Sequence, residues 1–219
     1  MKKTLLSVLT FSALCAADYE IHLPKVPEYK RPSRPNVPEA NHMPGKPAAA
    51  DSAANKTCLS AEEQRLVENI NNYRKSKGLP TLTATKSLTH VAQVHVKDLA
   101  ENNPASGACN MHSWSARGTW SACCYTRDHA KASCMWKKPS ELTAYQGNGY
   151  EISAMSSGGI DGVSALRIWQ SSSGHNAVII NEGMWNRPWR AFGVGIYRGY
   201  AVSWFGHGDD AAGAAPLCK

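Results

Sequence analysis

Six cysteines spread from Cys58 to Cys218 constrain the fold of this chain more than any other feature of its sequence. The N-terminus indicates export to an oxidising compartment, where an even number of cysteines predicts up to three disulfides. Neighbouring Cys123 and Cys124 are not expected to bond to each other, because adjacent residues rarely reach disulfide geometry without strain. A bridge from Cys58 to Cys218 would close the folded region end to end, and it is the one pairing we predict. The pairing stays otherwise open within the set Cys58, Cys109, Cys123, Cys124, Cys134 and Cys218.

Residues 1–17 have the composition of a secretory signal peptide. Two lysines precede an apolar run over residues 4–14, and small residues complete the segment. The run is shorter than the roughly 20 apolar residues that cross a bilayer, and no second apolar stretch follows it. A lipoprotein signal ending at Cys15 is disfavoured by the bulky Leu14 before it. We therefore expect a secreted protein, or a periplasmic one in a Gram-negative bacterium, with no transmembrane segment.

The remaining chain divides by composition into a proline-rich segment and one folded domain. Residues 18–57 hold seven of the twelve prolines and little apolar content, which predicts an extended, largely disordered tether. Residues 58–219 are long enough to bury a sizeable core as a single domain. Within an irregular stretch over 105–148, residues 117–148 are expected to form an insertion rich in Gly, Trp and Cys.

Charge and short motifs exclude several classes of protein. The formal net charge is +7, and removal of the two lysines of the signal leaves +5. The basic residues are scattered, which favours loose attraction to anionic surfaces over a nucleic-acid site. The sequence contains no His-Glu-x-x-His, Gly-x-Ser-x-Gly or Cys-x-x-Cys motif. The hydrolases and zinc ribbons that use these motifs are therefore not predicted.

Helical periodicity appears in three segments. Ser60 and Glu63 form a capping box that begins the first helix, and Gly78-Leu79-Pro80 ends it. The second helix is predicted over residues 86–101 and the third over residues 162–170. The positions predicted to face inward are Leu66, Ile70 and Tyr73 in the first helix, Leu88, Ala92, His95 or Val96, and Leu99 in the second, and Val163, Leu166 and Trp169 in the third.

The last part of the domain has the alternation of β-strands. Residues 189–197 and 200–205 alternate in polarity around a turn at Arg198-Gly199. This hairpin is the only clear strand pair, and no repeating βαβ pattern occurs. The sequence therefore predicts an α+β fold.

Six segments occur in the order found in one known family: residues 68–74, 78–82, 88–93, 109–113, 149–154 and 169–175. They resemble its first helix and helix exit, its second helix, and the segments that carry its first histidine, its Gly-Glu-Asn block and the bacterial form of its second-histidine motif. That family is the CAP superfamily, which comprises cysteine-rich secretory, antigen-five and pathogenesis-related group 1 proteins and shares the SCP domain. The likeness covers residues 59–206 and is to a bacterial-like variant with a cysteine-rich insertion.

The resemblance implies a three-layer α-β-α sandwich with a small antiparallel sheet, and a cavity that usually holds two histidines and two glutamates. His112, Glu151 and His175 match three of these four positions. The Gly-Glu-Asn block has an extra residue here and lacks its asparagine. The second glutamate is not evident, as it often is not in bacterial-type members. Gln170, which we include among the cavity residues, and Asp161 are the nearest candidates for it.

Three kinds of chemistry are open to these cavity residues, which are expected on or beside loops. His112 and His175, as neutral imidazoles, can bind a divalent cation such as Zn²⁺ and leave positions for water. Glu151 could ligate that cation, orient a histidine, or act as the catalytic base on bound water. The three groups could also form a hydrogen-bonded network without turnover. The sequence favours this last interpretation, and it identifies no certain cofactor.

The other histidines have simpler interpretations. His90 and His95 are five residues apart in the second helix, so they are not expected to share a ligand. His129 is expected in a solvated loop, and His207 in a polar tail with a weak cation site as the alternative.

The aromatic residues of the insertion allow two interpretations. Trp120, Tyr125 and Trp136 could form a contact surface for a glycan or a protein beside the cavity. They could instead form a small satellite core stapled by disulfides. We favour the core, because tryptophans are usually packing residues.

The predicted function is therefore that of a secreted CAP-domain protein that acts by binding. The resemblance implies a sterol or other lipid, a glycan or a protein partner as ligand. The alternative is a metal-assisted extracellular hydrolase that acts on peptide or cell-wall polymer with Glu151 as base. The oligomeric state does not follow from the sequence.

Overall fold

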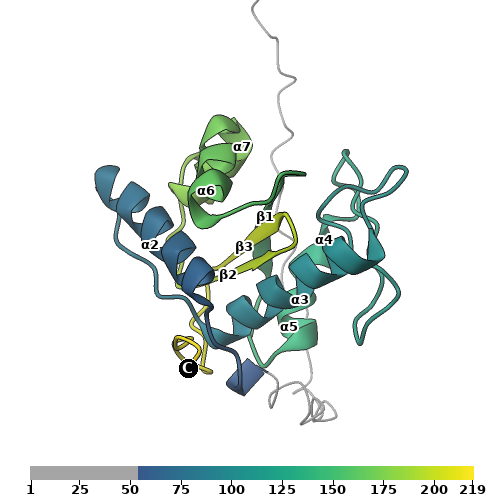
Figure 1. The fold of residues 1–219 in the computed structure, drawn as a ribbon, viewed down its shortest axis with the longest axis horizontal. Coiled ribbons are helices and arrows are strands. Elements are labelled where there is room, and N and C mark those ends of the chain that lie inside the picture. Colours follow the sequence, from purple (N-terminus) through teal and green to yellow (C-terminus); the bar gives the residue numbers. More distant parts are fainter. Residues whose placement is uncertain (1–53) are drawn as a thin grey trace, which may run out of the picture. The chain divides into compact units, whose positions relative to one another are not determined.

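The computed structural model describes residues 54–219. Its elements in chain order are α2 (Ala61–Ser76), α3 (Lys86–Asn102), α4 (Ala132–Trp136), α5 (Lys138–Leu142), β1 (Gly149–Met155), α6 (Gly162–Ser171), α7 (Ser173–Ile179), η1 (Gly183–Trp185), β2 (Ala191–Tyr197) and β3 (Tyr200–Gly206). They form three layers around a small sheet, with α2, α6 and α7 on one face and α3, α4 and α5 on the other (Figure 1). The predicted α+β fold with α-β-α layers is confirmed.

The sheet is antiparallel and has the strand order β1-β3-β2. β2 and β3 form the predicted hairpin, and its two turn residues, Arg198 and Gly199, have φ angles of 42° and 83°. Positive φ at both central residues is the turn geometry that matches the twist of the flanking strands. Strand β1, which the sequence did not predict, pairs with the other edge of β3 and makes that strand central.

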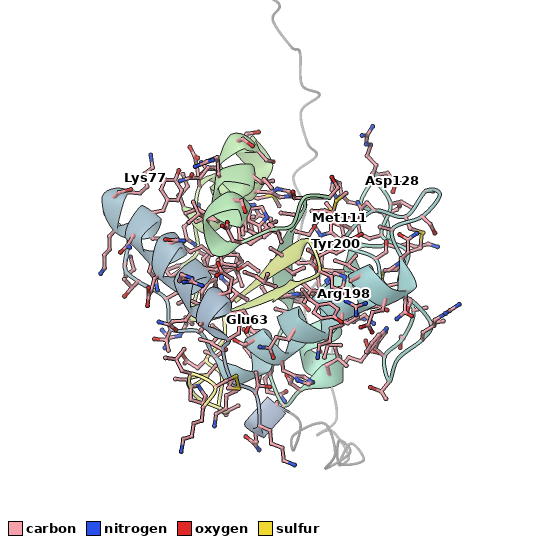
Figure 2. The ribbon with its side chains drawn as sticks, in the orientation of Figure 1. Glu63, Lys77, Met111, Asp128, Arg198 and Tyr200 are labelled. Carbon is pink, nitrogen blue, oxygen red and sulfur yellow. A yellow bond between two sulfur atoms is a disulfide. The ribbon has the colours of Figure 1, made fainter. Side chains whose placement is uncertain are left out.

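Helix α2 begins at the predicted capping box. Ser60 Oγ accepts a hydrogen bond from the backbone N of Glu63, and the Glu63 carboxylate accepts one from the backbone N of Ser60. The same buried carboxylate accepts from the Gln93 side chain on α3 at 3.0 Å and from the backbone N of Ile196 on β2 at 3.4 Å. Glu63, labelled in Figure 2, therefore connects α2 to α3 and to the sheet between them.

Helix α6 buries Trp169 as predicted and packs the partly buried Leu166 against the core, but the predicted inward position of Val163 is wrong. Its buried residues are Gly162, Ala165 and Trp169, whereas Val163 is 53% exposed. A Cβ atom on Gly162 would lie 2.8 Å from the backbone N of Leu66, so α6 approaches α2 through this glycine. The close backbone contact sets the rotation of the helix, which apolar periodicity alone could not reveal.

On the opposite face, α3 lies directly against β2. A Cβ atom on Gly193 would lie 2.2 Å from the backbone of Leu88 and Thr89, and one on Gly195 would lie 2.6 Å from that of Ala92. Glycine is required at these two positions because the helix backbone occupies the space of a side chain. This contact fixes the depth at which α3 sits on the sheet.

Three disulfides use all six cysteines of residues 54–219. Cys58–Cys218 closes the domain, as predicted, beside a bridge pair between Leu59 and Leu217. Cys109–Cys124 and Cys123–Cys134 staple residues 105–148, which we call the cysteine-rich segment, so the adjacent cysteines bond to different partners as expected.

The cysteine-rich segment is less irregular than the sequence predicted, because it contains α4 and α5. Lys138 begins α5 with a side chain that is only 1% exposed. Its Nζ donates to the carbonyl of Ser121 and lies 2.7 Å from a carboxylate oxygen of Glu141. The ion pair lies within α5 and satisfies a buried charge, and the bond to Ser121 ties the preceding loop to this helix.

The predicted signal peptide, residues 1–17, and most of the predicted tether, residues 18–57, lie outside the described residues. Of the tether, Ala54 and Thr57 are described and buried. No helix in residues 54–219 is long and apolar enough to cross a membrane.

Candidate functional site

A cleft of about 520 Å³ is bordered by β1, α7, η1 and the cysteine-rich segment. We call it the His/Glu cleft. The structure places His112, Glu151 and His175 in its lining, although they are far apart in the sequence. Apolar and aromatic side chains form much of the remaining wall, notably Tyr125, Met135, Trp136, Tyr150, Met184 and Trp185.

Glu151 lies on β1, where it pairs in register with Trp204 of β3, and not on a loop as expected. Its side chain is fully buried between two histidines. Oε1 accepts from Nδ1 of His112 at 3.2 Å, and Oε2 lies 2.8 Å from Nδ1 of His95. The second contact has ion-pair distance without the alignment of a linear hydrogen bond.

The ionisation of Glu151 follows from these neighbours. Burial raises the pKa of this carboxyl group, but the charge of His95 and the hydrogen bond from His112 outweigh it and hold the pKa at about 2. A carboxylate with so low a pKa is a weak proton acceptor near neutral pH. Glu151 could ligate a cation, act as a base or orient a histidine, and its geometry favours the last of these roles.

His112 lies on the loop that follows α3. Its backbone N donates to Oδ1 of Asn110 at 3.0 Å. The Cys109–Cys124 disulfide staples this loop, and the ring of Tyr125 packs 5.1 Å from the imidazole. The His112 side chain remains 19% exposed, so it borders the cleft while its Nδ1 faces Glu151.

His175 lies in α7, not on the loop that the preceding Ser-Gly pair suggested. The helix is held to α2 by a hydrogen bond of 2.8 Å from the Tyr73 hydroxyl to Oδ1 of Asn176. Nδ1 of His175 is buried and has no hydrogen-bond partner within residues 54–219. Burial and then His112 lower the pKa of His175 below its ordinary 6.5, while Glu151 acts in the opposite direction.

Gln170, included among the cavity residues on sequence, does not border the cleft. It follows Trp169 on α6 and is exposed, because the buried Trp169 turns the next residue toward solvent. Asp161 is the N-cap of the same helix, where its side chain accepts from the backbone N of Ser164. The described lining of the cleft therefore contains Glu151 as its only glutamate.

His95 is the residue that sequence reasoning missed. It is completely buried on α3 and makes the 2.8 Å contact with Glu151 from the side opposite the cleft lining. The signal available in the sequence was its position as an ionisable residue on the apolar stripe of the second helix. A buried histidine requires a polar partner, but the sequence could not show that Glu151 provides it.

The aromatic residues of the cysteine-rich segment divide between the core and the cleft. Trp120 packs edge-on against the buried Trp114, in a core cluster that also includes residues of α3 and β3. Tyr125 and Trp136 instead line the His/Glu cleft, and Trp136 packs 5.8 Å from Tyr150 of β1.

The remaining histidines of residues 54–219 have local partners. His90 lies 3.4 Å from the hydroxyl of Thr57, and His129 bonds the Tyr125 hydroxyl at 2.9 Å while bordering the cleft. His207 stacks on Trp189 with ring centroids 4.2 Å apart, so it is part of an aromatic cluster and not of a free tail.

The donor set suits a weakly held cation better than a resident metal. No group of three or more His, Cys, Asp or Glu side chains in residues 54–219 is arranged to hold a metal ion. His112 keeps Nε2 available while Nδ1 faces Glu151, and His175 has an unpartnered Nδ1. Two imidazoles leave two of the four positions of a tetrahedral Zn²⁺ ion to water.

A second cavity, of about 360 Å³, lies beside the Cys58–Cys218 disulfide. Its buried carboxylate, Glu63, is already bonded to Ser60 and Gln93. Because its polar groups serve the packing of α2 on α3, we assign the candidate site to the His/Glu cleft.

Residues 67–203 match the Cysteine-rich secretory protein family, CAP, over more than half of the chain. The chain belongs to the CAP family. The matched region includes α3, the cysteine-rich segment, β1 and α7, and hence His112, Glu151 and His175 of the cleft.

Three solved structures resemble this CAP protein. An extracellular protein containing a SCP domain from Bacillus anthracis has 22% identity and a TM-score of 0.47, over 75% of this chain and 44% of its own. An outer surface protein of Borrelia burgdorferi has 18% identity and a TM-score of 0.44, over 66% of this chain and 91% of its own. A cysteine-rich secretory protein from Staphylococcus aureus has 19% identity and a TM-score of 0.42, over 66% of this chain and 38% of its own. The chain thus spans less than half of the first and third proteins. No curated protein sequence matches it.

Proposed function

We propose that this protein is a secreted CAP protein that binds a small amphipathic ligand, such as a fatty acid or a sterol, in the His/Glu cleft. The observation that carries the proposal is a cleft of about 520 Å³ whose wall is mostly apolar and aromatic and contains two imidazoles beside a buried carboxylate. Binding sites for small molecules commonly have this size and this mixture of groups. The three disulfides support export.

The wall offers an apolar ligand a surface that is still accessible. Met184, on η1, is 84% exposed, and the adjacent Trp185 packs 5.1 Å from Tyr150 of β1. Trp136 meets Tyr150 from the cysteine-rich segment. Methionine adapts its shape to different apolar partners, and half-buried aromatic rings provide large contact areas. Together they would cover the apolar body of a ligand.

The polar groups would bind the other end of the ligand. Nδ1 of His175 is buried without a partner among the described residues, and burying such an atom costs free energy until it forms a hydrogen bond. A carboxyl or hydroxyl group of a ligand would supply that bond. The environment of His175 therefore selects a polar head group beside an apolar body.

Binding is favoured over turnover by the condition of Glu151. The hydrolase alternative needs this residue as a base, yet its carboxylate is buried between His95 and His112 with a pKa of about 2. If this protein hydrolyses a bond, the Glu151–His112 contact favours His112 as the base, because an oriented imidazole is the better acceptor near neutral pH. Assays on peptide and peptidoglycan substrates, with and without Zn²⁺, would test that second candidate.

Two methionines provide a matched test of ligand binding. Met184 borders the cleft, whereas Met155 is 51% exposed at the end of β1 and borders a different hollow. We expect saturable binding of cis-parinaric acid, measured by its fluorescence. The Met184→Ala substitution should weaken it by about fivefold and Trp185→Ala by tenfold or more. Met155→Ala should leave the affinity unchanged.

Other outcomes would redirect or remove the proposal. Saturable binding of chito-oligosaccharides but not of parinaric acid or a fluorescent sterol would replace the lipid with a glycan. Equal weakening by Met184→Ala and Met155→Ala would place binding outside the cleft.

A further inference from the structure

His95 occupies a closed position behind the His/Glu cleft. Its ring stacks on Trp114 with centroids 4.2 Å apart and an angle of 7° between the planes, and Trp204 meets it edge-on. The side chain is completely buried and does not border the cleft. Any influence of His95 on a ligand must therefore act through Glu151.

The hydrogen-bond partners of His95 determine how many protons His95 and Glu151 hold between them. Nε2 lies 3.0 Å from the carbonyl oxygen of Ser113. A carbonyl only accepts, so Nε2 carries a hydrogen. Nδ1 lies 2.8 Å from Oε2 of Glu151, at ion-pair distance although the two atoms are not aligned as a hydrogen bond, and a bare nitrogen facing a carboxylate at that distance would be repelled. The His95–Glu151 pair therefore holds a second proton.

Two features place this proton on His95. Oε1 of Glu151 already accepts from His112, which stabilises the carboxylate form. The face of Trp114 lies against the imidazole and favours a cation there.

We propose that His95 is a positioning residue of the cleft: a buried imidazolium that keeps Glu151 ionised and directs its Oε1 to Nδ1 of His112. The consequence is a single tautomer of His112, with the proton on Nδ1 and Nε2 free to accept. The clamp also holds the loop itself, because His95 bonds Ser113 while Glu151 bonds the adjacent His112. This positioning role of His95 holds whether or not the cleft binds a ligand, and whatever that ligand is.

The other charged groups around His95 are already paired. Asp98, one turn further along α3, accepts from the backbone N and the hydroxyl of Ser115. Lys138, from α5, lies 5.4 Å from the Trp114 ring centroid and pairs with Glu141. Glu151 is thus the carboxylate that faces the His95 ring.

The proton on His95 can be observed in the wild-type protein without ligand. Long-range ¹H–¹⁵N NMR of protein labelled at its eight histidines distinguishes protonated from bare ring nitrogens. At pH 8, imidazoles of ordinary acidity are neutral. We expect one histidine with both nitrogens protonated, which becomes neutral in Glu151→Gln. Absence of such a histidine, or its persistence in Glu151→Gln, would overturn the proposal.

The positioning role has its own readout. In His95→Gln, whose side chain keeps hydrogen-bonding groups but no charge, the doubly protonated signal should disappear and His112 should populate both tautomers. His90→Gln, on the same helix, is the control and should change neither. Near-UV circular dichroism checks the tryptophan packing of each variant. An unchanged His112 tautomer in folded His95→Gln would refute the positioning role. If His95→Gln fails to fold, the spectra of the wild type and of Glu151→Gln still decide the location of the proton. If the wild type shows this NMR pattern but does not bind parinaric acid, the proposed ligand is refuted and the positioning role of His95 is not.

Discussion

Nδ1 of His112 and Oε1 of Glu151 lie 3.2 Å apart, across the space between the loop after α3 and strand β1. Because a carboxylate only accepts, the contact places a hydrogen on Nδ1 of His112 and leaves Nε2 as the acceptor or metal ligand. A buried carboxylate that orients a histidine is a common arrangement behind functional imidazoles. The arrangement here gives the cleft a defined polar group before any ligand arrives.

The low pKa of Glu151 predicts a specific loss of stability in acid. A carboxyl group whose pKa is lower in the folded than in the unfolded protein stabilises the fold above its unfolded value, near 4.5, and this contribution is lost as pH falls toward the folded pKa of about 2. We expect the free energy of unfolding to fall by on the order of 3 kcal/mol from this group over that window. Urea denaturation at pH 5, 4, 3 and 2 measures it.

The matched variant for this test is Glu68→Gln, which removes an exposed carboxylate of α2. Glu68→Gln should lose as much free energy of unfolding in acid as the wild type does. Glu151→Gln should have a lower free energy of unfolding at pH 7, and that free energy should change less below pH 5. Parallel profiles for the two variants would contradict the assignment.

The close contact of α3 with β2 predicts a large effect from one added methyl group. Gly193→Ala would place a Cβ 2.2 Å from the backbone of Leu88 and Thr89, so helix and sheet must separate. We expect destabilisation of about 2 kcal/mol or more, measured by thermal or urea unfolding. Gly158→Ala, where a Cβ has no atom within 4 Å, should change stability by less than about 0.5 kcal/mol. Similar losses in both would show that α3 does not pack through this glycine.

The disulfides should differ in their contributions because their loops differ in length. Cys58–Cys218 spans 160 residues and Cys109–Cys124 spans 15. The loss of unfolded-chain entropy predicts about 5 kcal/mol for the long loop and about 3 kcal/mol for the short one. Double alanine variants, compared by denaturant unfolding, test this order. A larger loss from removing Cys109–Cys124 would mean that the short bridge acts mainly on the folded cysteine-rich segment.

Cation binding at His112 and His175 remains a prediction from the sequence that calorimetry can test. We expect weak Zn²⁺ binding that is abolished in His112→Ala/His175→Ala and retained in His90→Ala. It should weaken as pH falls, because protons compete for the ring nitrogens. Since the pKa of His175 is lowered, protons should compete with Zn²⁺ for this imidazole only below its ordinary pKa of 6.5. Equal Zn²⁺ binding by the wild type and the double variant would refute the site.

The sequence predicted the parts of this fold that local patterns encode. The capping box at Ser60 and the turn at Arg198-Gly199 depend on neighbouring residues, and both were found where expected. The Cys58–Cys218 bridge was also predicted, from its position at the two ends of the domain. Strand β1 was missed because its partner, β3, is about 50 residues away and its own pattern lacks clear alternation.

The candidate site was predictable only to the extent that motifs mark it. His112, Glu151 and His175 were chosen by resemblance, and they line one cleft. His95 belongs to no matched motif, and its role depends on the 2.8 Å approach of a strand that sequence did not predict. Gln170 was chosen for its closeness in sequence to His175, but the buried Trp169 directs α6 so that Gln170 faces solvent.

The central claim, that the His/Glu cleft binds an amphipathic molecule, is tested most directly by methyl NMR of methionine-labelled protein titrated with monomeric cis-parinaric acid. Met135 and Met184 border the cleft, and Met155 borders a separate hollow at the far end of β1. The account predicts saturable shifts of the Met135 and Met184 methyl signals with Met155 unchanged. Shifts confined to Met155, or no saturable shift at Met135 and Met184, would contradict it.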